Sequence, residues 1–275
     1  MTQGVLKGLW LAVLGLTAAV TSIRATAETV LITGSNQGIG LEFARQYAAR
    51  GWTVIATHRR SSTPETLAQL AKQYPKVRIE PLDVTDAGQI KALGAKLAGE
   101  PIDILLHNAG LVRTDPLDQP GGNTNQMFGT LDYALLDDFI HTNVAGPLQI
   151  TETLIDNVKT SRLKKIVAIS SAAGAISVPP FMPNGSPVPD HYWYRISKTA
   201  LNSAMRLLSA QLKDDGITVV MFHPGGVQVE SFGSVKLPGF VPPEEAIGRM
   251  IRTIDGLTLA DTGRFLQSDG KDHPW

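Results

Sequence analysis

The chain has 275 residues, a length typical of one large domain or two smaller ones. Its 25 Lys and Arg residues balance 25 Asp and Glu residues, and this zero net charge excludes a basic nucleic-acid-binding surface and an acidic disordered tail. The hydrophobic content of 43% is enough for a sizeable core. Cysteine is absent, which excludes a disulfide scaffold, a thiolate nucleophile and any cysteine-ligated metal site.

The N-terminal segment, residues 1–27, differs in character from the rest of the chain. Lys7 precedes an apolar run from Leu9 to Val20, and the small residues Ala25 and Ala27 follow. This order predicts a signal peptide cleaved after Ala27, and the run is shorter than a typical membrane span. An uncleaved membrane anchor and a helix packed on the domain are the alternatives. Cleavage predicts a periplasmic or secreted protein, whereas the alternatives predict a membrane-anchored or cytoplasmic one.

From Thr29 onward, short apolar runs rich in β-branched residues alternate with helix-like patterns. The predicted strands are 29–33, 52–57, 77–82, 103–108, 165–170 and 217–222, with a seventh near 263–269, and the predicted helices include 41–50, 63–74, 87–98 and 131–154. Strands that are apolar on both faces and alternate with helices indicate a mostly parallel sheet covered on both sides. We therefore predict one Rossmann-type, doubly wound α/β domain over residues 28–275.

A glycine-rich motif, TGSNQGIG at residues 33–40, comes directly after the first strand and opens the first helix. Gly34 allows a tight turn, Gly38 lets the backbone approach a pyrophosphate, and Gly40 permits close packing of the helix. The helix N-terminus adds N–H donors and a positive dipole for the phosphates. Asn36 and Ile39 lie within the same motif. The context predicts a dinucleotide site, and the alternative is a glycine-rich turn without a ligand.

The end of the second strand distinguishes the two nicotinamide cofactors. An acidic residue there accepts from the ribose 2′-hydroxyl of NAD, whereas an arginine suits the 2′-phosphate of NADP. Residues 57–60 read THRR and contain no acid. Arg59 is therefore the candidate for the 2′-phosphate, and the sequence favours NADP(H) over NAD(H). The alternative for Arg59 is a solvated basic side chain.

The ends of the third and fourth strands supply further candidates for cofactor binding. Asp83 and Val84 close the third strand, where a carboxylate can accept from the adenine amino group. Asn108, Ala109 and Gly110 close the fourth, where small residues let a cofactor lie across the sheet edge. Each segment taken alone is also typical of an ordinary turn.

Tyr194 and Lys198 are four positions apart, so they lie on one face of a predicted helix. Lowering the pKa of a tyrosine from about 10 to about 7 requires about 4 kcal/mol. One positive charge about 4 Å away at an effective dielectric of about 20 supplies that much. The pair therefore predicts a phenol that exchanges protons with a carbinol. Ser171, after the fifth strand, is placed to hold a substrate oxygen, and helix propensity does not explain Asn143 within its long helix.

The motifs TGSNQGIG, LDV, HNAG, ISSAAG, YRISK and HPGG, together with Asn143, occur in an order that resembles the short-chain dehydrogenase/reductase superfamily across residues 29–275. Within it, YRISKTALN, FHPGG and the ending RFLQSDGKDHPW are similar to C-factor and Sniffer-type carbonyl reductases. The resemblance implies an oxidoreductase that passes hydride between a nicotinamide cofactor and a carbonyl or alcohol. It also implies a homo-oligomer that pairs through helices such as the one carrying Tyr194.

Carried onto this chain, the resemblance makes Tyr194 the general acid/base. Lys198 lowers its pKa and holds the nicotinamide ribose, Ser171 orients the substrate oxygen, and Asn143 anchors a water in the proton relay. The implied cofactor contacts are Gly34, Asn36, Ile39, Arg59, Asp83, Asn108, Tyr194, Lys198, Pro224 and Gly225.

Three features depart from the family pattern. His107 replaces a usual asparagine, which we expect to alter packing only. Val229 replaces a threonine that often bonds the nicotinamide carboxamide, and the valine side chain cannot make that hydrogen bond. The proline-rich segment 175–193 is longer than usual and either shapes a substrate pocket or forms a surface loop.

Two functions remain open from the sequence. The first is NADP(H)-dependent reduction of a small-molecule carbonyl, or the reverse oxidation of an alcohol. The second is nucleotide binding by a signalling protein on the same fold. The presence of Asn143, Ser171, Tyr194 and Lys198 together favours the enzyme, because a binding module has no need of all four. The predicted export signal favours the signalling protein, because NADPH is scarce outside the cytoplasm. The histidines show no metal-ligand spacing, so no metal is expected. The balanced charge predicts no nucleic-acid partner.

Overall fold

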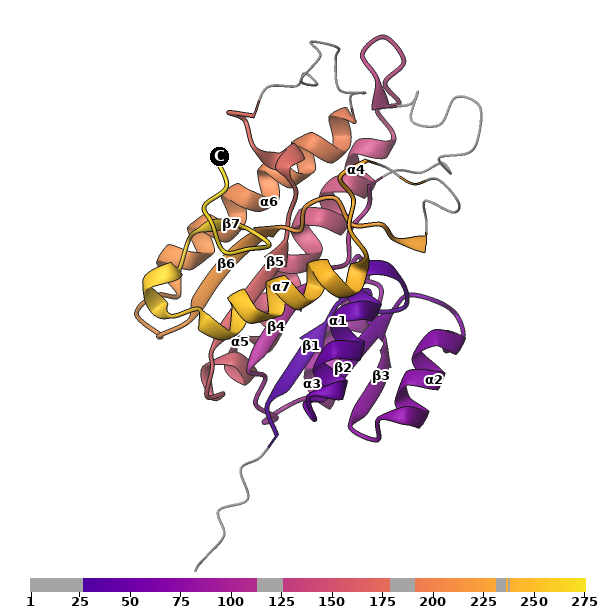
Figure 1. Ribbon diagram of the computed structural model, residues 1–275, viewed down its shortest axis with the longest axis vertical. Coiled ribbons are helices and arrows are strands. Elements are labelled where there is room, and N and C mark those ends of the chain that lie inside the picture. The colour runs from indigo at the N-terminus through magenta and orange to yellow at the C-terminus, as the bar shows by residue number, and fades with distance from the viewer. Residues whose placement is uncertain (1–26, 113–125, 179–190, 231–235, 237) are drawn as a thin grey trace, which may run out of the picture.

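Seven parallel strands form the sheet, in the order β3-β2-β1-β4-β5-β6-β7 (Figure 1). The strands are β1 (Thr29–Ile32), β2 (Thr53–His58), β3 (Val77–Pro81), β4 (Ile104–His107), β5 (Lys165–Ile169), β6 (Thr218–His223) and β7 (Phe265–Gln267). The predicted strands and the doubly wound class are confirmed. The strand order reverses between β1 and β4, and in such sheets a ligand crevice opens at the carboxyl ends of these two strands.

The computed structural model describes residues 27–112, 126–178, 191–230, 236 and 238–275. The predicted signal peptide or anchor therefore lies outside the described residues, apart from Ala27, and so does most of the segment 175–193. Among the helices in the described part of the chain, none combines the length and apolar character that a membrane span requires.

Helices cover both faces of the sheet, as Figure 1 shows for α1 and α7 on the near face. The α-helices are α1 (Gly38–Ala49), α2 (Glu65–Gln73), α3 (Ala87–Lys96), α4 (Leu135–Ile140), α5 (Gly146–Lys159), α6 (Tyr192–Gln211) and α7 (Pro243–Gly256). Alternate strand residues enter opposite cores. Val30 and Ile32 pack with α1, α2 and α7, whereas Leu31 packs with α3, α5 and α6. This burial on both faces explains why each strand is almost continuously apolar.

The helix predicted over residues 131–154 is confirmed from Leu135 onward, but it is not α-helical throughout. The structure divides it into α4, a π-helical turn η2 (His141–Ala145) and α5. Pro147 supplies a physical reason, because proline has no N–H to donate to the carbonyl group of Asn143 and its ring crowds that carbonyl. π-Helical turns often accompany functional sites, and this one contains Asn143.

His107, at the end of β4, is buried between the sheet and α5. Its Nε2 lies 2.8 Å from Oγ1 of Thr151, whose hydroxyl in turn donates to the carbonyl oxygen of Pro147 at 2.8 Å. His107 therefore donates from Nε2 to this hydroxyl. Burial lowers the pKa of His107 to about 3, so the imidazole is neutral in the folded protein at ordinary pH.

We predict that His107→Asn makes the stability of the protein less sensitive to acid. Below the ordinary histidine pKa of about 6.5, the unfolded chain binds a proton at His107 that the folded chain does not. The free energy of unfolding then falls by up to about 1.4 kcal/mol per pH unit between about pH 6 and 4 from this residue alone. Urea unfolding of both proteins across this range should give a shallower slope for the variant, with parallel curves above pH 7. Equal slopes below pH 6 would contradict the assignment.

Candidate active site

A cleft of about 300 Å³ opens at the carboxyl ends of β1, β2, β3 and β4, where the strand order reverses. Its lining includes Gly34, Asn36, Gly38, Ile39, Gly40, Arg59, Asp83, Val84, Asn108, Ala109 and Gly110. The structure thus brings together eleven predicted cofactor-binding residues from four separate segments. Pro224 and Gly225 follow β6 and do not line this cleft, but Val229 from the same segment does.

The glycine-rich turn needs glycine at each of its three glycine positions. Gly34 and Gly38 have φ values of +69° and +56°, a region that other L-residues rarely adopt. Gly40 has no room for a side chain, because a Cβ there would lie 2.3 Å from the oxygen of Gly34 and 2.4 Å from Nδ2 of Asn108. The predicted close packing at Gly40 is confirmed, and it occurs against the turn after β1 and the Asn108 side chain after β4.

Side-chain hydrogen bonds of Asn108 and Thr33 fix this turn to the segment after β4. The Asn108 amide donates from Nδ2 to the carbonyl oxygens of Thr33 and Gly34, at 3.0 and 2.9 Å. The Thr33 hydroxyl oxygen accepts from the N–H groups of Asn108 and Ala109, both at 3.0 Å. Asn108 also lines the cleft, so these bonds give it a structural role in addition to the cofactor contact that was predicted for it. Sequence reasoning gave Thr33 no role, although its place at the start of the TG motif is a usable signal.

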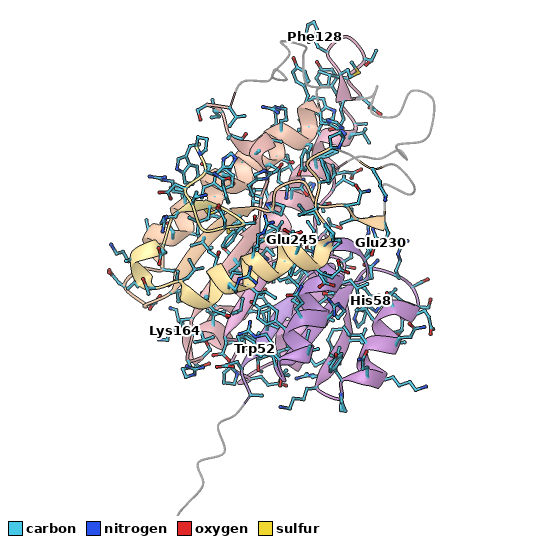
Figure 2. All side chains as sticks on the ribbon, viewed as in Figure 1. Trp52, His58, Phe128, Lys164, Glu230 and Glu245 are labelled. Carbon is cyan, nitrogen blue, oxygen red and sulfur yellow. The ribbon has the colours of Figure 1, made fainter. Side chains whose placement is uncertain are left out.

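Glu230 brings a carboxylate to the N-terminus of α1 (Figure 2). Its Oε2 accepts from the N–H of Gly38 at 3.0 Å, and the neighbouring Val229 lies beside the same glycine. The N-cap residue Gln37 makes no side-chain capping bond, so this N–H is free for an anion from outside the helix. A carboxylate 192 positions away in the chain therefore lies at the helix N-terminus, where an anionic group is favoured. No local sequence signal predicts this contact.

The far end of the cleft is more polar. Arg59 is exposed at the end of β2 and lines the cleft together with Arg60. Asp83 accepts through Oδ1 from the N–H of Thr85 at 2.9 Å and from its hydroxyl at 2.7 Å. The carboxylate of Asp83 is thus held in a fixed turn at the rim of the cleft.

A second cluster combines residues from three elements. Tyr194 and Lys198 lie on α6, Ser171 precedes the short 3-10 helix η3 (Ala172–Gly174), and Asn143 lies in η2. Ser171 lies near enough to Tyr194 for its side chain to lower the pKa of the phenol. The ammonium of Lys198 lies 5.8 Å from the centre of the Tyr194 ring. The four predicted catalytic residues therefore surround one location.

The charges in this cluster depend on burial. Burial raises the pKa of the Tyr194 phenol above its ordinary value, and the Ser171 side chain acts in the opposite direction. Burial also lowers the pKa of Lys198 to about 8. Lys198 was expected to lower the pKa of Tyr194. In the structure its ammonium donates to the carbonyl oxygen of Ile169 at 2.8 Å, and burial has the largest effect on the pKa of Tyr194.

Asn143 is nearly fully buried, and its side-chain amide forms hydrogen bonds with two separate segments of the chain. Its Oδ1 accepts from the N–H of Leu111 at 2.7 Å, and its Nδ2 donates to the carbonyl oxygen of Leu111 at 2.9 Å and to Oγ of Ser197 at 2.8 Å. Ser197 had no predicted role, although it lies inside the YRISK motif next to Lys198. Asn143 thus ties the chain after β4 to α6.

Gly110 is the point at which the cleft and the catalytic cluster meet. It lines the cleft, and a Cβ built on it would lie 3.3 Å from Oδ1 of Asn143 and 3.4 Å from Nζ of Lys198. A molecule that extends along the cleft past Gly110 therefore reaches the catalytic cluster. Within the described part of the chain, no group of histidine and acidic residues is arranged to hold a metal ion.

Comparison with known proteins gives consistent matches. The model of the short chain dehydrogenase family matches residues 28–237. A 1-hydroxy-2-glutathionyl-2-methyl-3-butene dehydrogenase of Rhodococcus sp. is 30% identical over 90% of this chain and all of its own length. The C-signal protein of Myxococcus xanthus is 28% identical over 68% of this chain and all of its own. An NADPH-bound carbonyl reductase from chicken fatty liver, a solved structure, has a TM-score of 0.76 and 30% identity, covering 90% of this chain and 99% of its own.

The chain therefore belongs to the short-chain dehydrogenase family, and it is an oxidoreductase. The matches to C-signal and to a carbonyl reductase confirm the resemblance that the ordered motifs indicated.

We predict that Gly40→Ala destabilises the protein even without a ligand. The new methyl group meets the Gly34 carbonyl and the Asn108 amide, and overpacking of this kind costs about 1–3 kcal/mol. For a chain of this size that loss lowers Tm by roughly 3–10 °C. Thermal unfolding followed by circular dichroism measures the effect.

Gly248→Ala is the matched control for this substitution. Gly248 lies in α7, where a Cβ would make only ordinary contacts of 3.5 Å. Alanine is the better helix former, so this variant should keep or raise the wild-type Tm. If Gly40→Ala unfolds at the same temperature as Gly248→Ala, the proposed packing of the turn is wrong.

Proposed function

We propose that the protein reduces a carbonyl compound to an alcohol, or catalyses the reverse reaction, with NADP(H) as the hydride carrier. The observation that carries this proposal is the grouping of Tyr194, Ser171 and Lys198 at the Gly110 end of the cleft. A hydroxyl pair at the end of a dinucleotide-shaped cleft can bind a carbonyl oxygen and deliver a proton to it.

The residues present fit a dinucleotide. The first turn of α1 has no side-chain cap, and the N–H of Gly38 binds an anionic group, the Glu230 carboxylate, which must leave this N–H before a phosphate can bind there. When bound, the cofactor supplies the hydride from its nicotinamide ring. Gly34, Gly38 and Ile39 would border the pyrophosphate, Asp83 and Val84 the adenine, and Ala109 and Gly110 the segment leading to the nicotinamide.

Each catalytic residue then has a distinct task. Tyr194 gives a proton from Oη to the carbonyl oxygen as that oxygen gains negative charge. Ser171 donates a hydrogen bond to the same oxygen and orients it. Lys198 supplies positive charge near the phenol and is placed to hold the nicotinamide ribose, for which its ammonium must share or leave the Ile169 carbonyl. Asn143 keeps the chain at Leu111 in place and, in the proposed relay, anchors the water that returns a proton.

The choice of NADP(H) is supported by the end of β2. Arg59 lines the cleft, and residues 57–60 contain no acidic side chain that would accept from a ribose 2′-hydroxyl. The chicken carbonyl reductase of similar structure has NADPH bound. A guanidinium group can bind a 2′-phosphate with two parallel hydrogen bonds.

We predict that Tyr194→Phe abolishes most carbonyl reduction while sparing cofactor binding. The variant keeps the aromatic ring but loses the proton donor, and general acid catalysis contributes about 100- to 10,000-fold in rate. NADPH oxidation with a panel of aldehydes and ketones measures kcat, and fluorescence titration measures the Kd for NADPH. Wild-type turnover by this variant would rule out the proposed mechanism.

Two further substitutions act as controls for Tyr194→Phe. Ser171→Ala should lower kcat and leave the Kd for NADPH unchanged, because Ser171 is assigned to the substrate oxygen alone. Lys198→Ala should impair both, because its ammonium is assigned to the phenol and the ribose. Cofactor binding by the wild-type protein with no turnover of any carbonyl would instead support a nucleotide-binding signalling protein.

We predict that Arg59→Ala weakens NADPH binding and leaves NADH binding nearly unchanged. A charge-assisted hydrogen bond contributes roughly 1.5–3 kcal/mol, so the Kd for NADPH should rise about tenfold to a hundredfold. Parallel titrations of the wild type and the variant with both cofactors provide the measurement. An equal loss for NADPH and NADH would assign Arg59 a structural role.

A further inference from the structure

His223 contacts the loop that carries Ser171, and the proposed mechanism does not use it. It is the last residue of β6, next to the carboxyl end of β5. The N–H of Ser170 donates to the carbonyl oxygen of Phe222 at 2.8 Å, which continues the sheet pairing one residue beyond β5. The N–H of Ala172 then donates to Nδ1 of the His223 ring at 3.1 Å. The N–H of Ala172 therefore binds the His223 side chain and not a backbone carbonyl of β6.

These two bonds hold the backbone on both sides of Ser171. Ser170 is tied to β6 through its N–H, and Ala172 is tied to the same strand through the His223 side chain. The Ser171 hydroxyl also accepts from the N–H of Ala173 at 3.1 Å, at the start of η3. The position of the hydroxyl that faces Tyr194 therefore depends on where Ala172 is held.

The His223 ring is itself held by the C-terminal segment. The ring of His273 meets it edge-on at a centroid distance of 5.0 Å, with an angle of 79° between the planes. The N–H of His273 donates to the carbonyl oxygen of Phe265 in β7 at 2.7 Å, and the two side-chain rings lie 4.7 Å apart. The last residues of the chain therefore limit the movement of the His223 ring.

The chemical state of the ring suits an acceptor. The N–H of Ala172 points at Nδ1, which must carry a lone pair, so the remaining ring proton lies on Nε2. Burial, with a smaller contribution from His273, lowers the pKa of His223 to about 4. The imidazole is therefore neutral at ordinary pH and can accept this bond.

We propose that His223 is a positioning residue for catalysis, which acts by holding the Ala172 N–H and, through it, the hydroxyl of Ser171. This inference rests on the proposed function, because it requires Ser171 to bind the substrate oxygen. His223 does not touch the substrate. Its effect reaches the reaction through the geometry of the Ser171 loop, where a displacement of about 1 Å is enough to slow a reaction strongly.

The test compares His223→Leu with His223→Asn. Leucine fills space but cannot accept a hydrogen bond, whereas Oδ1 of asparagine lies at the same number of bonds from the backbone as Nδ1 of histidine. We expect His223→Leu to lower kcat for carbonyl reduction about tenfold or more, with the Kd for NADPH within twofold of wild type. His223→Asn should recover most of the lost kcat. Equal losses in the two variants would overturn the proposal.

Ala172→Pro removes the N–H that donates to His223 and so breaks the same hydrogen bond without changing the histidine. This variant tests the proposal even if the His223 variants do not fold. Ala172 is the first residue of η3, and Ser171 before it is extended at φ −160° and ψ 152°. Proline is accepted at the first position of a helix after an extended residue. We expect this variant to show the same loss of kcat as His223→Leu. Wild-type kcat in Ala172→Pro would contradict the proposal.

A double-mutant cycle with Ser171→Ala separates positioning from general damage. If His223 acts only through Ser171, then adding His223→Leu to Ser171→Ala should change kcat by less than about twofold. Multiplication of the two single effects would show that His223 acts independently and would overturn the proposal. The proposed function fails in a different way, because then the wild-type protein itself reduces no carbonyl compound.

Discussion

The hydrogen bonds that Asn108 and Thr33 make across β1 and β4 are the interactions on which the rest of the site depends. They fix the glycine-rich turn, which lines the cleft, at the place where the strand order reverses. Gly40 can approach this turn only because it has no side chain. The shape of this part of the cleft is therefore set by hydrogen bonds and packing within the chain.

A second set of contacts joins the cleft to the catalytic cluster. Pro147 interrupts the helix, and the resulting π-helical turn contains Asn143, whose amide holds both backbone groups of Leu111. The same amide reaches Ser197 on α6, the helix that carries Tyr194. The π-helical turn thus links the end of the cleft to the helix that carries Tyr194.

The features that sequence could predict are those with a local cause. The strands, the glycine turn and the spacing of Tyr194 and Lys198 follow from hydrophobic pattern, backbone freedom and helix periodicity. The π-helical turn within the helix through Asn143 was not predicted, because the pattern of apolar residues does not register the effect of Pro147 on the preceding turn. The carboxylate of Glu230 at the Gly38 N–H was missed, since that contact joins segments far apart in the chain.

The central claim is that the cleft and the Tyr194 cluster together transfer a hydride to a carbonyl carbon. The most direct measurement uses NADPH dideuterated at C4 of its nicotinamide ring, incubated with the wild-type protein and a panel of aldehydes and ketones, with the products analysed by mass spectrometry and NMR. The account predicts an alcohol that carries deuterium on its carbinol carbon. Tight binding of the labelled NADPH without deuterium in any product would contradict it.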